Sequence, residues 1–175
     1  MSQMLVSIIM PAHNNASHIA AAIESVLSQT HTQWELLIVD DASTDQTLEL
    51  AESFQAKDSR IKVFVMGENQ GASFCRNYAT KKSSGDFIAH LDADDLWMPI
   101  KLERQLAFMR QHDLGVSYTT HKQIDLEGKD RGTKVLALGE LSAAKQKTNN
   151  FVGNLTGMYA ADKVGRLMAP DMRKR

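Results

Sequence analysis

Short apolar runs alternate with helical patterns along the first two thirds of this chain. The apolar runs occupy residues 5–10, 34–39, 61–65, 87–91 and 115–119, and the segments between them repeat apolar residues at helical spacing. This alternation favours a doubly wound, mostly parallel α/β sheet with right-handed crossovers. Beyond Thr120 the pattern weakens, and we expect a turn at 125–130, a short helix at 140–147 and a strand at 154–160.

Length and composition fit one soluble domain. A chain of 175 residues with 43% hydrophobic and 23% charged residues can bury one sizeable core. A net charge of −1 gives no global basic field of the kind that binds nucleic acid. The single cysteine, Cys75, excludes an internal disulfide framework and fits a reducing cytoplasm as a small core residue. We expect no transmembrane segment and no signal peptide.

Acidic residues follow two of the expected strands. Residues 87–91 run directly into Asp92, Asp94 and Asp95, and residues 34–39 are followed by an Asp40-Asp41 pair. Both groups belong at the carboxyl edge of a parallel sheet, where ligands bind in open α/β folds. Hard oxygen donors there suit Mg²⁺ or Mn²⁺ held partly by a phosphorylated substrate. For an isolated Asp-x-Asp, the alternative is a solvated turn that caps the next helix.

Four segments in register make the chain similar to a known family. They are Val6-Ser7-Ile8-Ile9-Met10-Pro11-Ala12-His13-Asn14, Trp34 through Asp45, Asn69-Gln70-Gly71-Ala72-Ser73 with Arg76-Asn77, and Leu91-Asp92-Ala93-Asp94-Asp95-Leu96-Trp97. In this order they resemble the motifs of the family 2 glycosyltransferases, inverting enzymes with the A-type, Rossmann-like nucleotide-diphospho-sugar transferase fold. The resemblance is strong over residues 5–120 and loose beyond.

The resemblance assigns the nucleotide end of a donor site. It implies that Pro11, Ala12 and His13 border the base and ribose. Asp41 matches the acid that hydrogen-bonds the uracil edge, and a carboxylate suits an imide N–H because it only accepts hydrogen bonds. Arg76 either contacts the nucleotide or pairs with an aspartate.

The resemblance also assigns the diphosphate end. Asp92 and Asp94 match the family's Asp-x-Asp signature and are the two residues assigned to the metal. Asp94 is the direct metal ligand, and Asp92 either contacts the ribose or supports the groups that bind the metal. Ala93 faces the ribose through its backbone. The implied cofactor is a divalent cation, Mn²⁺ or Mg²⁺, which would stabilise the charge on the departing nucleoside diphosphate.

The general base that inversion requires is not visible in the sequence. The family's base is an acid on a later helix, and Met168 to Arg175 resembles the segment before that helix, so we expect the base beyond Arg175. Asp162 and Asp171 are the only acids after Glu140, and neither matches the family pattern. We expect residues 1–120 to form the donor-binding half and 121–175 to begin the acceptor side of the same domain.

Three functions remain open at this point. The first is a glycosyltransferase of cell-envelope polysaccharide synthesis that moves a sugar from a UDP-sugar to a glycan or lipid-linked acceptor. The second is a truncated, non-catalytic module that binds nucleotide sugars. The third is a Mg²⁺-dependent phosphotransfer domain, disfavoured because the first strand ends in Pro11-Ala12-His13 without an acid. The expected location is the cytoplasm or the inner face of the membrane.

Neither the donor sugar, the acceptor nor the oligomeric state follows from the sequence. Apolar residues between Phe151 and Tyr159 predict an exposed surface that favours self-association. We also expect a chain without the base to bind donor and to transfer sugar slowly.

Overall fold

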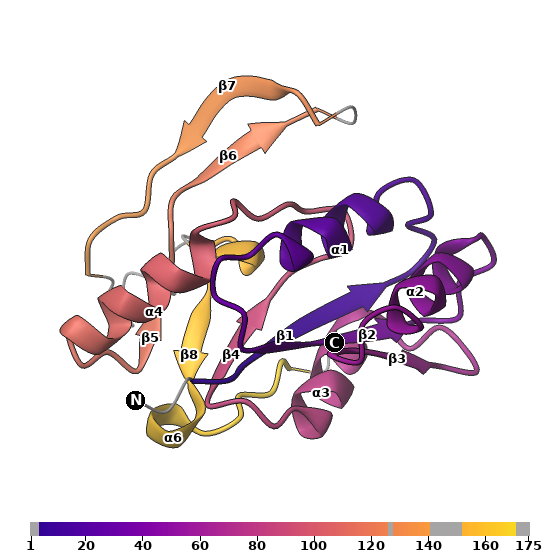
Figure 1. Ribbon diagram of the computed structural model, residues 1–175, viewed down its shortest axis with the longest axis horizontal. Coiled ribbons are helices and arrows are strands. Elements are labelled where there is room, and N and C mark those ends of the chain that lie inside the picture. Colours follow the sequence, from indigo (N-terminus) through magenta and orange to yellow (C-terminus); the bar gives the residue numbers. More distant parts are fainter. Residues whose placement is uncertain (1–3, 126–127, 141–151, 171–175) are drawn as a thin grey trace.

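The computed structural model describes residues 4–125, 128–140 and 152–170, which form an α/β fold around a six-stranded sheet (Figure 1). The strands are β1 (Val6–Ala12), β2 (Trp34–Asp40), β3 (Ile61–Val65), β4 (Phe87–His90), β5 (Val116–Ser117) and β8 (Met158–Ala160), in the order β3-β2-β1-β4-β8-β5. The main helices are α1 (Ile19–Leu27), α2 (Thr47–Gln55), α3 (Ala72–Lys82) and α4 (Lys101–Gln111).

The first four strands are mutually parallel, as the alternating pattern predicts. β1 lies between β2 and β4, and β3 pairs with the outer side of β2. β1 and β2 are buried along their whole length, which explains why apolar residues dominate both strands. The expected α/β fold with a mostly parallel sheet is therefore confirmed.

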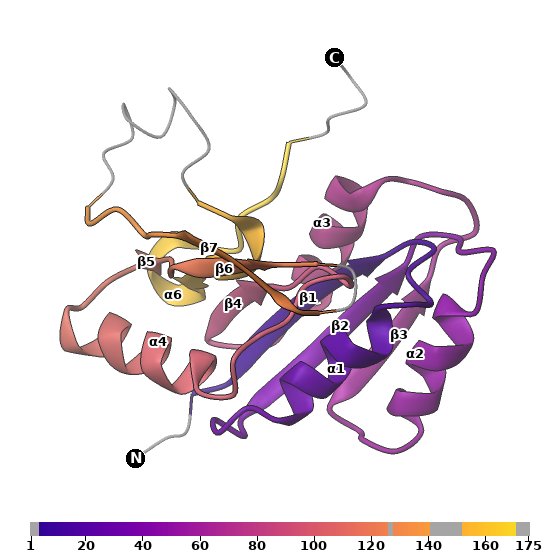
Figure 2. The ribbon, with the colours of Figure 1, turned by 90° about the horizontal axis from the view of Figure 1, so that it is seen from above.

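Helices cover both faces of this sheet, as Figure 2 shows. α1, α2 and α4 pack on one face through residues such as Ile23, Ala51 and Leu106. α3 packs on the other face, where Cys75 and Ala79 meet the inner strands. Cys75 is fully buried, in agreement with its expected place in the core.

The last third of the chain returns to the sheet. β8 is inserted between β4 and β5 and runs antiparallel to both. The strand expected at 154–160 is thus shorter and is preceded by a 3₁₀ turn, η1 (Asn154–Thr156). Because β8 lies inside the sheet, Met158 and Tyr159 are buried. The expectation of an exposed apolar surface is wrong for these two residues, and Phe151 lies outside the described residues.

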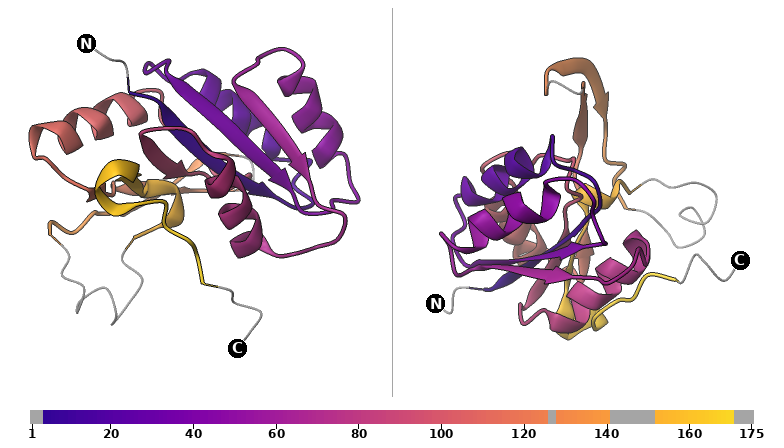
Figure 3. Two further views of the ribbon diagram at one scale, coloured as in Figure 1. Left: turned by 90° about the horizontal axis from the view of Figure 1, so that it is seen from below. Right: turned by 90° about the vertical axis from the view of Figure 1, so that its right-hand side faces the viewer.

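A two-stranded hairpin stands apart from the main sheet (Figure 3). It consists of β6 (His121–Ile124) and β7 (Asp130–Val135), and β7 is exposed along its whole length. Where a turn is expected at 125–130, Gly128 N donates to the Asp125 carbonyl, while residues 126–127 lie outside the described residues. Its strands were not predicted because they carry no apolar alternation. The helix expected at 140–147 falls almost entirely outside the described residues.

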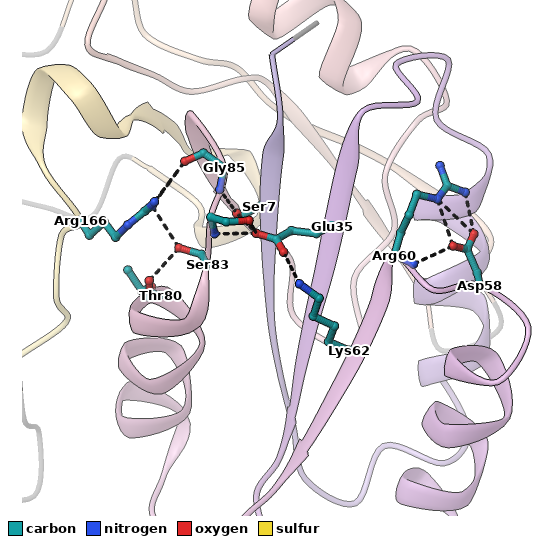
Figure 4. Close-up of polar contacts among 10 residues, drawn as sticks. Ser7, Glu35, Asp58, Arg60, Lys62, Thr80, Ser83, Gly85 and Arg166 are labelled. Atoms are coloured by element: carbon teal, nitrogen blue, oxygen red, sulfur yellow. Dashed lines mark hydrogen bonds and ion pairs between the residues drawn. The ribbon is translucent and has the colours of Figure 1, made fainter.

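Buried polar contacts join the amino ends of the strands (Figure 4). The Glu35 carboxylate on β2 accepts from Ser7 Oγ on β1 at 2.7 Å and from Lys62 Nζ on β3 at 2.8 Å. It also accepts from the backbone N–H of Ser84, just before β4, at 2.6 Å. Burial is the largest single influence on the pKa of Glu35 and raises it. The hydrogen bonds together outweigh burial, so the pKa is lowered to about 2.

The segment after β8 is tied to the same end of the sheet. A short helix, α6 (Ala161–Val164), follows β8, and Arg166 beyond it donates to Ser83 Oγ and to the Gly85 carbonyl. Within the part of the chain that the structure describes, no helix combines the length and the apolar character needed to cross a bilayer.

Candidate functional site

The carboxyl ends of β1, β2 and β4 meet at one edge of the sheet, and a cavity of about 250 Å³ lies there. Its lining residues are Pro11, Ala12, His13, Asn15, Asp41, Ala72, Arg76, Asp92, Ala93 and Asp94. All eight residues assigned to donor binding from the sequence lie in this lining. Asn15 and Ala72 are additions that the sequence motifs did not single out.

His13 is held against the end of β2. Its Nδ1 lies 2.8 Å from the Asp41 carbonyl oxygen, and because a carbonyl only accepts, Nδ1 carries the proton. The backbone N–H of His13 donates to Asn15 Oδ1 at 3.0 Å, while Asn14 adopts a positive φ of 52°. These hydrogen bonds hold the loop after β1 against the end of β2.

Asp41 organises the opposite wall of the cavity. Its carboxylate is buried and accepts one bond from Gln70 N and one from Gly71 N, each at 2.7 Å. Gly71 has a φ of +85°, which glycine adopts without strain, and α3 begins at the next residue. The carboxylate thus positions the turn that leads into α3. The sequence motif marked both segments but did not show that they touch.

Asp92 has donors from two elements. Of the two roles left open for Arg76, pairing with an aspartate is the one observed: its Nη2 lies 2.6 Å from Asp92 Oδ1. The side-chain amide of Asn154, in η1, lies 3.1 Å from both oxygens of the same carboxylate. Asn154 is the residue that sequence reasoning did not assign to the site, because it is 62 positions from Asp92 and lies outside the four segments that resemble the family.

Asp94 and Asp95 occupy different environments. Asp94 is exposed, and its carboxylate has no hydrogen bond or ion pair to any described residue. Asp95 is half-buried, and burial, followed by the nearby charges of Asp92 and Asp94, raises its pKa to about 6. Negative charge is therefore concentrated in this loop. Among residues 4–125, 128–140 and 152–170, no three His, Cys, Asp or Glu side chains converge as a ready-made metal cage.

Behind this loop, Trp97 packs into the core. It is 6% exposed, and its Nε1 donates to the Leu155 carbonyl at 2.9 Å. The ammonium of Lys101 lies 3.7 Å from the centroid of the Trp97 ring, and burial lowers its pKa to about 7. These contacts join the start of α4 to η1.

Sequence comparison identifies relatives of this chain. Residues 7–165 match the model of glycosyl transferase family 2. The putative teichuronic acid biosynthesis glycosyltransferase TuaG of Bacillus subtilis (strain 168) is 36% identical over 171 residues, which are 98% of this chain and 68% of TuaG. The UDP-Glc:alpha-D-GlcNAc-diphosphoundecaprenol beta-1,3-glucosyltransferase WfgD of Escherichia coli is 44% identical over 125 residues, 71% of this chain and 49% of WfgD.

Solved structures show the same fold. S. aureus TarS 1-349 in complex with UDP-GlcNAc is 34% identical, with a TM-score of 0.61 over 65% of this chain and 33% of that one. The same protein in complex with UDP has a TM-score of 0.75 over 96% of this chain and 51% of that one, at 24% identity. The mannosyltransferase PcManGT from Pyrobaculum calidifontis, in complex with GDP-Man and Mn²⁺, has a TM-score of 0.72 at 18% identity, covering 95% and 48%.

Proposed function

We propose that this chain, which belongs to glycosyl transferase family 2, binds a UDP-sugar at the carboxyl edge of its sheet for transfer of the sugar, with inversion, to a glycan or lipid-linked acceptor. The observation that carries this proposal is the cavity into which β1, β2 and β4 each deliver polar residues. WfgD is named as an enzyme that uses UDP-Glc and a diphosphoundecaprenol-linked sugar, which supports the donor and acceptor classes.

Pro11, Ala12, His13 and Asp41 form the nucleotide end of the proposed site. Pro11 and Ala12 contribute an apolar part of the lining that would border the base and ribose. The Asp41 carboxylate accepts from the backbone N–H groups of Gln70 and Gly71 and has a side-chain hydrogen bond with Cys75. Because a carboxylate offers about four lone-pair sites, it keeps capacity to accept the imide N–H of uracil. We therefore retain uracil as the proposed base.

Asp94 and Asp92 form the diphosphate end and would hold the divalent cation. The donor set fits a hard cation: three carboxylates lie within four positions and Arg76 is the cation paired with one of them. Asp94 is exposed and free to bind. Mg²⁺ sites of this kind use one or two carboxylates and complete their coordination with substrate phosphates, so a ready-made cage is not needed. When bound, the ion would neutralise charge on the leaving diphosphate.

The general base is proposed to come from outside the described residues. Asp162, one of the two late acids in the sequence, is exposed and lines a different cavity together with Asp86 and Phe87. Asp86 and Phe87 lie at the start of β4, whereas Asp92 follows its end. Asp162 therefore lies at the opposite edge of the sheet from Asp92. Asp171 is outside the described residues. We propose residues 1–120 as the donor half and 121–175 as the start of the acceptor side.

Calorimetric titration with UDP, in EDTA and in Mn²⁺, tests this function. We expect Mn²⁺ to increase the UDP affinity of the wild type about tenfold or more, and Asp94→Ala to abolish that gain. Asp162→Ala is the matched control, because it removes the same charge at the opposite edge of the sheet. Equal wild-type affinity in EDTA and in Mn²⁺ would overturn the metal-assisted site, and no UDP binding at all would overturn the donor class.

A further inference from the structure

Three consecutive residues of η1 form hydrogen bonds to the loop after β4, residues 91–97, and to α4. The Asn154 amide donates to both oxygens of Asp92 at 3.1 Å. The Leu155 carbonyl accepts from Trp97 Nε1 at 2.9 Å, and the Thr156 carbonyl accepts from Gln105 Nε2 at 3.0 Å. Two of these three anchors use the backbone of η1, and only the first uses a side chain.

The Asp92 carboxylate therefore accepts hydrogen bonds from two sides. Arg76 approaches from α3, 2.6 Å from Oδ1, and Asn154 approaches from η1. A carboxylate has about four lone-pair sites, and these contacts use three of them. The orientation of Asp92 is thus set before any donor binds, and Asp94 is left as the unpaired acid on the cavity wall.

We propose that Asn154 is a positioning residue that fixes Asp92 at the donor edge and couples this edge to the late segment of the chain carrying η1. The proposal rests on the function proposed above. Partners that orient the ligands of a metal are typically worth about 10–100-fold in metal affinity. Coupling of this kind is reciprocal, so occupancy of the donor edge also stabilises the docked position of η1.

A substitution at position 154 isolates this contact. Because Trp97 and Gln105 bind backbone carbonyls, η1 keeps both of those anchors when the Asn154 side chain is removed. Asn154 is exposed, so truncation leaves no cavity in the core. Asn154→Ala therefore removes the amide from Asp92 and leaves the fold in place.

The test compares Asn154→Ala with wild type by UDP calorimetry in EDTA and in Mn²⁺. We expect the Mn²⁺-dependent gain to fall about tenfold and the affinity in EDTA to stay within about twofold of wild type. Asn154→Gln, which keeps the donor group, should recover part of the gain. Asn77→Ala is the matched control: Asn77 exchanges two hydrogen bonds with Ala169 and so anchors a late segment without touching Asp92.

Two results would overturn the proposal: an unchanged Mn²⁺-dependent gain in Asn154→Ala, or an equal loss in EDTA and Mn²⁺, which would indicate a general structural role.

A measurement without ligand tests the Asn154 contact separately from the proposed function. The NMR signals of the Asn154 side-chain amide should shift in Asp92→Asn and stay in place in Asp94→Ala. A wild type without any Mn²⁺-dependent gain would remove the metal function, while absence of the amide shift would remove the Asn154 contact.

Discussion

At the scale of single residues, Asp41 shows how one carboxylate serves both the fold and the proposed chemistry. Its oxygens accept from two backbone N–H groups of the turn before α3, while its own carbonyl accepts from His13. The walls of the cavity formed by β1, β2 and α3 are thus joined through this one residue. A nucleotide that uses Asp41 would meet an acceptor already held in place.

Asp41→Asn should weaken this junction. The asparagine side chain has one oxygen and one NH₂ group in place of two oxygens. One of the two backbone N–H groups would therefore face another donor at hydrogen-bonding distance. We expect a loss of about 1–3 kcal/mol in the free energy of unfolding and weaker UDP binding. Urea denaturation and calorimetry measure the two effects. Asp162→Asn, at an exposed position, is the control, and unchanged stability of Asp41→Asn would contradict the assigned role.

At the scale of elements, the Glu35 contacts connect β1, β2, β3 and the turn before β4 at the amino ends of the strands. These strand ends lie opposite the proposed site. The network therefore fixes the spacing of the strands whose other ends form the cavity. Its members come from four separate segments, so it forms only when the sheet is assembled.

Stability should depend on pH through Glu35. Its carboxyl has a folded pKa of about 2, below the ordinary value of 4.5. Its contribution is fully present above pH 4.5 and is lost as the pH falls from there towards 2, with a maximum of about 3 kcal/mol. Denaturant unfolding at several pH values measures this, with Glu35→Gln as the comparison. The same acid dependence in both proteins would refute the assignment.

Gly85 should not tolerate a side chain. A Cβ there would lie 2.6 Å from Ser7 N and 2.9 Å from the Leu5 carbonyl oxygen, so the backbones at the start of β1 and β4 would have to separate. We expect Gly85→Ala to cost about 1–3 kcal/mol of stability. Gly67→Ala, where a Cβ meets nothing within 4 Å, is the matched control. Equal midpoints of thermal unfolding for the two variants would disprove the close approach.

At the scale of the whole molecule, helices cover both faces of the sheet (Figure 2). The cavity lies at the carboxyl edge of the sheet. Cys75 lies on the face of α3 that packs against the sheet and is fully buried, and burial chiefly raises the pKa of its thiol to about 12. Such a thiol is inert in the folded state, because the thiolate is the reactive form. Its labelling can therefore report opening of the fold.

We expect thiol reagents to label Cys75 only as the protein unfolds, and UDP with Mn²⁺ to slow that labelling. Ligand at 100 times its Kd adds about 2.7 kcal/mol to the free energy of unfolding, which corresponds to about hundredfold slower labelling. The rate is followed by absorbance or mass spectrometry, with urea-unfolded protein as the reference. Fast labelling of the native protein would contradict the buried position of Cys75.

The sequence by itself determined the elements and the edge at which they act. Continuous apolar runs such as 36–39 specify buried parallel strands, because a strand buried on both faces has no solvent-facing polar side. Parallel strands place their carboxyl ends together, so Asp41 and Asp92 had to meet at one edge. Local patterns therefore sufficed for the fold class and for β1 to β4, and the resemblance of the motifs to a known family supplied eight of the ten residues that line the cavity.

Only the tertiary structure decided which groups touch. Asn154 reaches Asp92 across 62 positions, and Gln70 reaches Asp41 across 29. Contacts at such separations depend on how loops close and helices pack, which no periodicity encodes. The same reason explains why β8 was foreseen as a strand, while its antiparallel place between β4 and β5 was not. The sequence pattern determines whether a segment forms a helix or a strand, and tertiary packing determines which other segment it contacts.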